Sequence, residues 1–185
     1  MKKAFLFPGQ GSQFIGMGEE LAGRFEAARD VFSEVDETLG EKLSVLMFRG
    51  DIEELTLTKN AQPAIMAVSI AILRVMLSNG MDLKAINIFA GHSLGEYSAL
   101  CASGVISLRD TTLILRKRGL AMQQAVPEGQ GSMVAVLGMS NEVINELISI
   151  SRCDSSLIQV ANDNDPSQVV ISGEKKEVQK FSAFL

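Results

Sequence analysis

Two short apolar runs in the chain are each followed by a glycine-rich turn. Residues 4–7 lead into residues 8–12 (PGQGS), and residues 86–90 lead into residues 91–95 (GHSLG). Short β-branched and aromatic runs that are bounded by turn residues are typical of buried strands. Because an apolar-periodic segment follows the second turn and ends at Gly104, the pattern there predicts a strand, a sharp turn and a helix.

Three more segments carry the signals of helix starts and stops. Apolar residues recur every three or four positions over residues 21–39, and Gly40 follows as a C-cap. Asp51 and Glu54 have the spacing of a cap for a shorter helix, and a capping box of Ser and Asp opens a helix over residues 107–124. We therefore predict three helices, the first of which presents one apolar face to a core.

A long apolar helix is predicted between the two strands. Pro63 suits the first position of a helix, and the apolar pattern then runs to about Leu77. Ser69 and Arg74 interrupt this run, which is also shorter than the roughly 18 to 20 residues that a membrane span needs. We expect a mostly buried core helix and no membrane partner.

The pattern changes at residues 127–131 (PEGQG), where we place a domain boundary. Residues 1–126 contain helices and only two convincing strands, whereas residues 127–185 alternate as strand, helix, strand, strand and helix. The second order is that of a ferredoxin-like unit without its last strand. We expect an α/β protein with a parallel-sheet domain in residues 1–126 and a ferredoxin-like subdomain in residues 127–185, both incomplete.

Composition narrows the classes of function. The chain has 17 Lys and Arg against 22 Asp and Glu, so its net charge of −5 offers no attraction to a nucleic-acid backbone. Cys101 and Cys153 lack metal-binding or redox spacing, and the apolar N-terminal run is too short for a secretory signal. We expect reduced thiols, a cytoplasmic location, no metal and no nucleic-acid partner.

The turn GHSLG matches the pattern G-x-S-x-G, in which small flanking residues let a strained turn between strand and helix expose a serine hydroxyl. Ser93 is therefore the candidate nucleophile. Leu94 follows it at the start of the predicted helix, so its backbone N–H would point at the oxyanion of an acyl-transfer reaction. A second donor should come from the loop after a neighbouring strand, and we expect it to be the N–H of Gln10.

Arg118 is the candidate cation of the site. Its predicted helix surrounds it with mostly apolar residues: Leu108, Thr111, Ile114, Leu115 and Met122. Arg116 and Lys117 point elsewhere and are expected to be solvated. A half-buried guanidinium requires an anion, and either an internal Glu or the carboxylate of a substrate would satisfy it.

Four separated motifs together resemble one enzyme family. They are residues 7–13 (FPGQGSQ), residues 62–64 (QPA), residues 91–96 (GHSLGE), and Arg118-Gly119 with Met122-Gln123. In this order they resemble the N-terminal portion of malonyl-CoA:acyl-carrier-protein transacylase. The resemblance implies a hydrolase-like parallel-sheet domain with an inserted ferredoxin-like small subdomain. It also implies a serine that takes malonyl from coenzyme A and gives it to the phosphopantetheine thiol of acyl carrier protein, in fatty acid biosynthesis.

The resemblance also assigns residues and partners. Ser93 would carry the malonyl ester, and Arg118 would hold the free carboxylate of malonyl through paired hydrogen bonds. Gln62 and Asn162 would bind substrate, although a polar residue at a helix start and an asparagine in a turn need no function. Malonyl-CoA is then the substrate, acyl carrier protein is the partner, and no tightly bound cofactor is expected.

This set of residues lacks a general base. Serine needs a base within hydrogen-bond reach, and the only histidine, His92, adjoins Ser93 at the turn, where adjacent side chains project differently. We expect His92 to support the turn, and the resemblance places the family's base C-terminal to Leu185. Three hypotheses stay open: a fragment of an acyltransferase, a noncatalytic remnant that binds acyl carrier protein or coenzyme A, and an α/β-hydrolase-type esterase.

Overall fold

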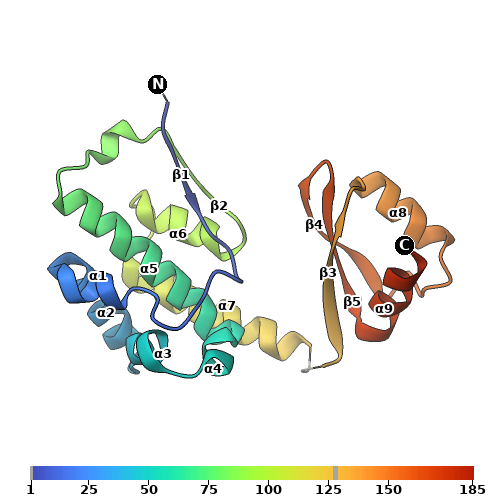
Figure 1. Cartoon of the computed structure of the whole chain (residues 1–185), viewed down its shortest axis with the longest axis horizontal. Coiled ribbons are helices and arrows are strands. Elements are labelled where there is room, and N and C mark those ends of the chain that lie inside the picture. Colours follow the sequence, from blue (N-terminus) through green and yellow to red (C-terminus); the bar gives the residue numbers. More distant parts are fainter. Residues whose placement is uncertain (1, 127–128) are drawn as a thin grey trace. The chain divides into compact units, whose positions relative to one another are not determined.

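A computed structural model describes residues 2–126 and 129–185 of the chain (Figure 1). It divides into two compact units, of which the first ends at Gln123 and the second begins at Gln124. The turn expected at residues 127–131 falls in part on Pro127 and Glu128, which lie outside the described residues. Each unit is described by itself below.

A parallel pair of strands forms the sheet of the first unit. Strand β1 (Ala4–Phe7) pairs with β2 (Ile88–Gly91), in a register that sets Ala4 against Ile88 and Phe7 against Gly91. Both strands were predicted, with β2 shifted toward the glycine-rich turn. Because parallel strands end at the same edge, the two glycine-rich turns leave the sheet side by side.

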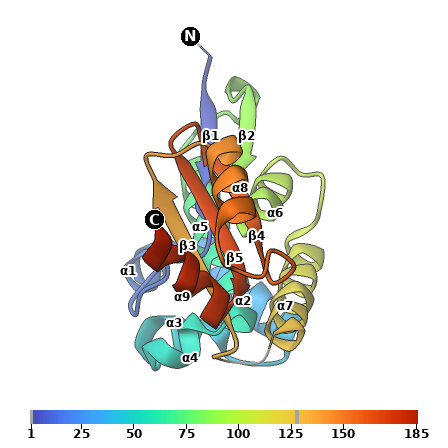
Figure 2. The same ribbon diagram turned by 90° about the vertical axis from the view of Figure 1, so that its right-hand side faces the viewer.

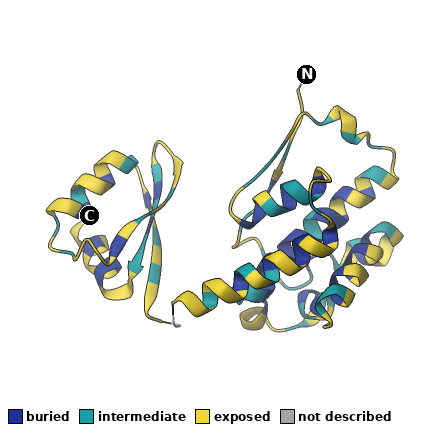
Figure 3. Ribbon diagram, turned by 180° about the vertical axis from the view of Figure 1, so that it is seen from behind, coloured by how far each residue is buried: buried dark blue, intermediate teal, exposed yellow. Residues whose placement is uncertain are grey.

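Helices make up the rest of the first unit: α1 (Glu19–Arg24), α2 (Glu26–Leu39), α3 (Leu43–Arg49), α4 (Ile52–Thr56), α5 (Thr58–Ser78), a 3-10 turn (Leu83–Ala85), α6 (Leu94–Ala102) and α7 (Leu108–Ala125). They bury their inward faces and expose their outer ones (Figure 3). The helix expected over residues 21–39 is two helices, because Phe25 is extended (φ −123°, ψ 126°). Gly40 caps the second one in the left-handed conformation (φ 67°), as predicted.

Helix α5 is the core helix of the first unit, and it packs against α2 and α6. It begins at Thr58, so the prediction that Pro63 is its first residue is wrong. The five residues before Pro63 carry no apolar pattern, and tertiary hydrogen bonds hold them in helical form. Length and composition would let α5 cross a membrane, but 61% of its apolar window is buried inside the protein, as in the core helix of a soluble domain.

The second unit is an antiparallel sheet covered by two helices. Its elements are β3 (Gly131–Leu137), α8 (Asn141–Ile150), β4 (Ile158–Asp165), β5 (Gln168–Glu174) and α9 (Lys175–Phe184). This is the predicted order of strands and helices, and the strands lie in the order β3-β5-β4. Both helices lie on one face of the sheet (Figures 1 and 2), where Ile144 of α8 and Phe181 of α9 are buried with Ile171 of β5.

A buried carboxylate ties the second unit together. Glu177 of α9 is only 7% exposed; it accepts a hydrogen bond from the backbone N–H of Asp154 at 2.9 Å and pairs with Lys180. The hydrogen bond from Lys180, followed by that from Asp154, holds the pKa of Glu177 below its ordinary value of 4.5. The ionised form is therefore the one that stabilises the fold.

Replacing Glu177 by glutamine is expected to make the free energy of unfolding of the second unit less dependent on pH in the acidic range. A carboxyl group with a lowered pKa contributes stability above its ordinary pKa and loses it as the pH falls through the lower, folded value. Urea unfolding should give the wild type a higher free energy of unfolding than Glu177→Gln at about pH 7, and this difference should be smaller at about pH 3. Glu146→Gln, at an exposed position of α8, is the matched control. An equal gap between wild type and Glu177→Gln at both pH values would contradict the assignment.

Candidate active site

Ser93 stands at a strained turn between β2 and α6. Its backbone dihedral angles are φ 56° and ψ −114°, and no other non-glycine residue among those described has a positive φ. Such a conformation is costly, and it persists where the surrounding structure enforces it, which is common at active sites. The predicted strand, turn and helix around Ser93 are confirmed, and the serine is exposed.

The glycines on either side of Ser93 are required by close backbone contacts. A Cβ atom on Gly91 would lie 2.1 Å from the carbonyl carbon of Gly95, and a Cβ on Gly95 would lie 2.3 Å from the carbonyl oxygen of Phe7. Any larger residue would force the strand and the helix apart. The two glycines therefore let the start of α6 sit directly on the end of the sheet.

The loop after β1 lies against this turn. The backbone N–H of His92 donates to the carbonyl of Phe7 at 3.3 Å, and a Cβ on Gly9 would lie 3.0 Å from His92 Nδ1. The loop is braced internally, since Ser12 Oγ donates to the carbonyl of Gly9 at 3.0 Å. Gln10 follows Gly9 and is thus held beside the turn at residues 91–95, which is called the elbow below. An oxyanion donor must lie at this place.

Leu94 is the first residue of α6, so its N–H has no acceptor within the helix. This N–H group directly follows Ser93 in the chain and lies at the N-terminus of α6, which is the positive end of the helix dipole. The structure therefore brings together the two backbone segments from which the sequence predicts an oxyanion hole. The donor roles of Gln10 and Leu94 remain predictions.

Arg118 of α7 reaches across to Ser93. Its Nη2 donates to Ser93 Oγ at 3.1 Å, and its Nη1 donates to Oε1 of the fully buried Gln62 at 2.7 Å. Its guanidinium carbon lies 5.7 Å from the ring centroid of Tyr97, which is within cation–π range. Four residues thus form one cluster, and they come from three parts of the sequence: α5, the start of α6 with its N-cap, and α7.

The sequence analysis gave Tyr97 no role, so its contact with Arg118 is a feature that the sequence analysis missed. The signal was present in the spacing, because a residue four positions after Ser93 in a helix lies on the same face. Gln62 is itself oriented from its other end, since its Nε2 donates to Met122 Sδ at 3.2 Å. The cluster of Ser93, Arg118, Gln62 and Tyr97 is called the clamp cluster below.

The prediction that Arg116 is solvated is wrong. Its side chain is only 16% exposed, pairs with Glu41, and donates from Nη1 to Asn60 Oδ1 at 2.8 Å. An internal Glu was considered as a partner for Arg118, but the Glu found in this region, Glu41, pairs with Arg116 instead. Two residues expected beside Arg118 on the buried face, Ile114 and Met122, are 38% and 46% exposed. The buried stripe of α7 is narrower than predicted, and both arginines lie at its edges.

Three further predicted features have mixed outcomes. His92 is exposed and lies against the glycine-rich loop. Asn162 belongs to the second unit and lies within β4 beside Val170, so the prediction that it occupies a turn is wrong. Over residues 2–126 and 129–185, no group of three His, Cys, Asp or Glu side chains is arranged to hold a metal ion.

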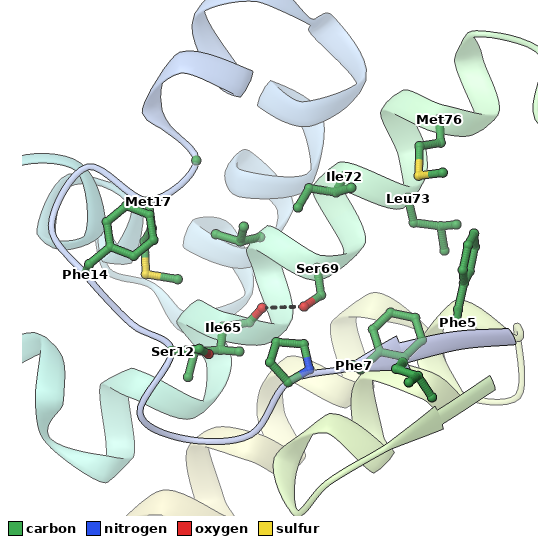
Figure 4. Close-up of a pocket in the computed structure, with 14 residues that line it drawn as sticks. Phe5, Phe7, Ser12, Phe14, Met17, Ile65, Ser69, Ile72, Leu73 and Met76 are labelled. Carbon is green, nitrogen blue, oxygen red and sulfur yellow. Dashed lines mark hydrogen bonds between the residues drawn. The ribbon is translucent and has the colours of Figure 1, made fainter.

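A cavity of about 290 Å³ lies between β1 and α5 (Figure 4). Phe5, Phe7, Ile65 and Leu73 are among the apolar side chains that line it. Its polar lining is already engaged, as the hydroxyl of Ser69 donates to the carbonyl of Ile65 at 2.9 Å. None of the described lining residues belongs to the clamp cluster. The reactive groups are in the clamp cluster, so we take that cluster, not the cavity, as the candidate active site.

Comparison with known proteins identifies the family of this chain. The family model described as "Acyl transferase domain" matches residues 4–185. A malonyl CoA-acyl carrier protein transacylase of Bacillus subtilis (strain 168) is 52% identical over 181 residues, which cover 98% of this chain and 56% of the relative. A relative from Haemophilus influenzae with the same description is 43% identical over 188 residues, covering 99% of this chain and 58% of its own length.

Solved structures are similar as well. An acyl-carrier-protein-S-malonyltransferase from Bartonella henselae has a TM-score of 0.93 and 54% identity, covering 100% of this chain and 59% of its own. A malonyl-transacylase in complex with its type II PKS acyl-carrier protein has a TM-score of 0.90 and 40% identity, covering 99% and 58%. The chain spans little more than half the length of these relatives. Because the family model matches almost the whole chain, the chain belongs to the acyl transferase domain family.

Proposed function

We propose that this chain supplies the acyl-binding half of a malonyl-CoA:acyl-carrier-protein transacylase of fatty acid biosynthesis. The observation that carries the proposal is the 3.1 Å contact between Arg118 Nη2 and Ser93 Oγ, which sets a permanent cation beside the candidate nucleophile. The similarity to relatives described as malonyl transacylases supports it. Ser93 would carry the acyl group between the thiol of coenzyme A and the thiol of acyl carrier protein.

Arg118 suits the free carboxylate of a malonyl group. A malonyl ester on Ser93 holds that carboxylate one methylene from the ester carbonyl, within reach of a guanidinium that already touches Ser93 Oγ. Arginine has five N–H donors, of which Gln62 and Ser93 engage two. The rest can bind a carboxylate in a paired, charge-assisted geometry. An acetyl group has no carboxylate that could pair with Arg118, so the clamp cluster favours a malonyl group over an acetyl group.

The transfer itself requires Ser93 Oγ to attack the thioester carbonyl. The N–H groups of Leu94 and Gln10 would stabilise the developing oxyanion. The carbonyl would re-form as the bond to sulfur breaks, and the proton lost by Ser93 would end on the sulfur of the released coenzyme A. Arg118 favours a negative Oγ but cannot accept its proton, because a guanidinium stays protonated. We expect His92 to support the turn, so these residues would bind and orient the acyl group while the base comes from elsewhere.

The second unit is assigned to the same function. Its strand order β3-β5-β4, with both helices on one face, supports a ferredoxin-like subdomain. Asn162 would contribute to substrate binding by resemblance to the family. Acyl carrier protein and the coenzyme A thioester are the proposed partners, and the proposed location is the cytoplasm.

The test is to follow the acyl group on the protein. Incubation with malonyl-CoA should add the mass of one malonyl group to the intact chain, and added holo-acyl carrier protein should then remove it. Loading should be slower than in a complete relative by about 10² to 10⁴-fold, the usual contribution of general-base catalysis. Acetyl-CoA under the same conditions should load much less.

Other outcomes would favour the other hypotheses. An ester that forms but is lost to water at the same rate with and without acyl carrier protein would indicate an esterase. Binding of malonyl-CoA without any covalent adduct would indicate a noncatalytic remnant. Loading of acetyl as readily as malonyl would contradict the role given to Arg118.

A further inference from the structure

The first turn of α5 is capped by a residue from another helix. Leu57, at the N-cap position, provides no side-chain hydrogen bond to the helix. The backbone N–H of Lys59 instead donates to Oε1 of Gln123, near the end of α7, at 2.9 Å. An N–H in the first turn has no acceptor in its own helix, and a side-chain oxygen that satisfies it stabilises the helix start. Here that stabilisation also joins two helices.

The two helices touch at this same point. A Cβ on Gly119 would lie 2.6 Å from both the Cα of Lys59 and the carbonyl oxygen of Thr58, so α7 crosses the start of α5 backbone to backbone. Gln123 follows Gly119 by one helical turn and lies on the same face. The crossing is therefore held by a glycine that permits close approach and a glutamine that bonds across it.

Arg118 and Gln62 both depend on this crossing. Arg118 precedes Gly119 in α7, and Gln62 comes three residues after Lys59 in α5. The 2.7 Å bond between Arg118 and Gln62 spans the two helices directly beside the Gln123 cap. A change in how α7 rests on α5 would therefore move the guanidinium relative to Ser93.

We propose that Gln123 is a positioning residue for Arg118: by capping α5 it fixes the crossing of α7 and α5, and so the place of the guanidinium beside Ser93. The inference rests on the proposed function for its effect on substrate choice. Gln123 does not itself touch Ser93 or the acyl group. It acts through the helix start to which it is bonded.

Three variants separate the hydrogen bond from the bulk of the side chain. Gln123→Met keeps the length but removes the acceptor oxygen. Gln123→Glu keeps an acceptor, and a carboxylate is favoured at a helix N-terminus. Gln124→Met, at the exposed neighbouring position, is the matched control.

Two measurements are made on each variant of the whole chain. The first is the ratio of the dissociation constants for acetyl-CoA and malonyl-CoA. This preference should fall roughly fivefold in Gln123→Met, the effect of one lost hydrogen bond, and return in Gln123→Glu. The second is the NMR signal of the Arg118 Nε–H group together with hydrogen exchange at the Lys59 amide. In Gln123→Met the signal should shift and the exchange should quicken, while Gln124→Met leaves all these values unchanged.

The two measurements distinguish the failure of this inference from the failure of the proposed function. An unchanged Arg118 signal in Gln123→Met would overturn the positioning role, whatever the chain binds. If the wild type binds both thioesters equally while Gln123→Met still shifts the Arg118 signal, the proposed function fails and the positioning role stands. Equal weakening for both thioesters in Gln123→Met, without rescue by Gln123→Glu, would indicate a general loss of structure and also overturn the inference.

Discussion

Replacing Ser93 by alanine is expected to abolish the malonyl adduct completely. Oγ is the atom that would form the ester, and the backbone around Ser93 already presents it at the exposed elbow. Removal of a covalent nucleophile leaves binding and oxyanion donors in place but no acceptor for the acyl group. Intact mass measurement after prolonged incubation with malonyl-CoA checks this result, and Ser103→Ala, at the other end of α6, serves as the control. Survival of the adduct in Ser93→Ala would show that another residue is acylated.

A glycine at the same position separates chemistry from strain. Ser93→Gly also lacks Oγ and should be equally inert, but glycine adopts a positive φ without the penalty of a side chain. We expect the free energy of unfolding of Ser93→Gly to exceed that of wild type by about 1 to 3 kcal/mol. Ser93→Gly should therefore unfold at a higher urea concentration. Equal stabilities of wild type, Ser93→Ala and Ser93→Gly would mean that the elbow stores no strain.

Replacing Arg118 by alanine should lower the rate of malonyl loading far more than the rate of acetyl loading. The substitution removes the charged partner of the malonyl carboxylate and leaves the oxyanion donors untouched. Loss of one member of a close charge pair typically reduces binding by several kcal/mol, so we expect malonyl loading to fall roughly a hundredfold or more. Acetyl loading should change by only a few fold, because acetyl makes no bond to the guanidinium.

Two further variants define what Arg118 supplies. Arg118→Lys keeps the charge but loses the planar pair of donors, so it should recover only part of the malonyl preference. Lys117→Ala, at the exposed adjacent position, should leave both reactions as they are. Rates of loading from malonyl-CoA and acetyl-CoA, measured in parallel by mass spectrometry, decide the matter. Equal losses for the two donors in Arg118→Ala would contradict the clamp.

The amino-acid sequence by itself determined the features that depend on neighbouring residues. The elbow at Ser93 follows from a short apolar run, two glycines at the right spacing and an apolar helix after them. The caps at Gly40, Asp51 and Ser107 were likewise readable, because each involves hydrogen bonds within a few residues along the chain. The two strands of the first unit and the order of elements in the second unit were readable in the same way. Local geometry settles where these elements lie along the chain, whereas the parallel pairing of Ala4–Phe7 with Ile88–Gly91 is a tertiary contact.

Only the tertiary structure decided which polar side chains meet across helices. Arg116 and Arg118 are two positions apart on one helix, yet Glu41 pairs with the first and Ser93 with the second. The local pattern placed only Arg118 beside the apolar stripe, and it left the burial of Arg116 and the partners of both arginines undetermined, since periodicity assigns a face and not a partner. The early start of α5 has the same origin, because its polar first turn is held by Gln123, 64 positions away. These bonds form only when packing of the apolar faces has brought the helices together, so their partners are set by the fold as a whole.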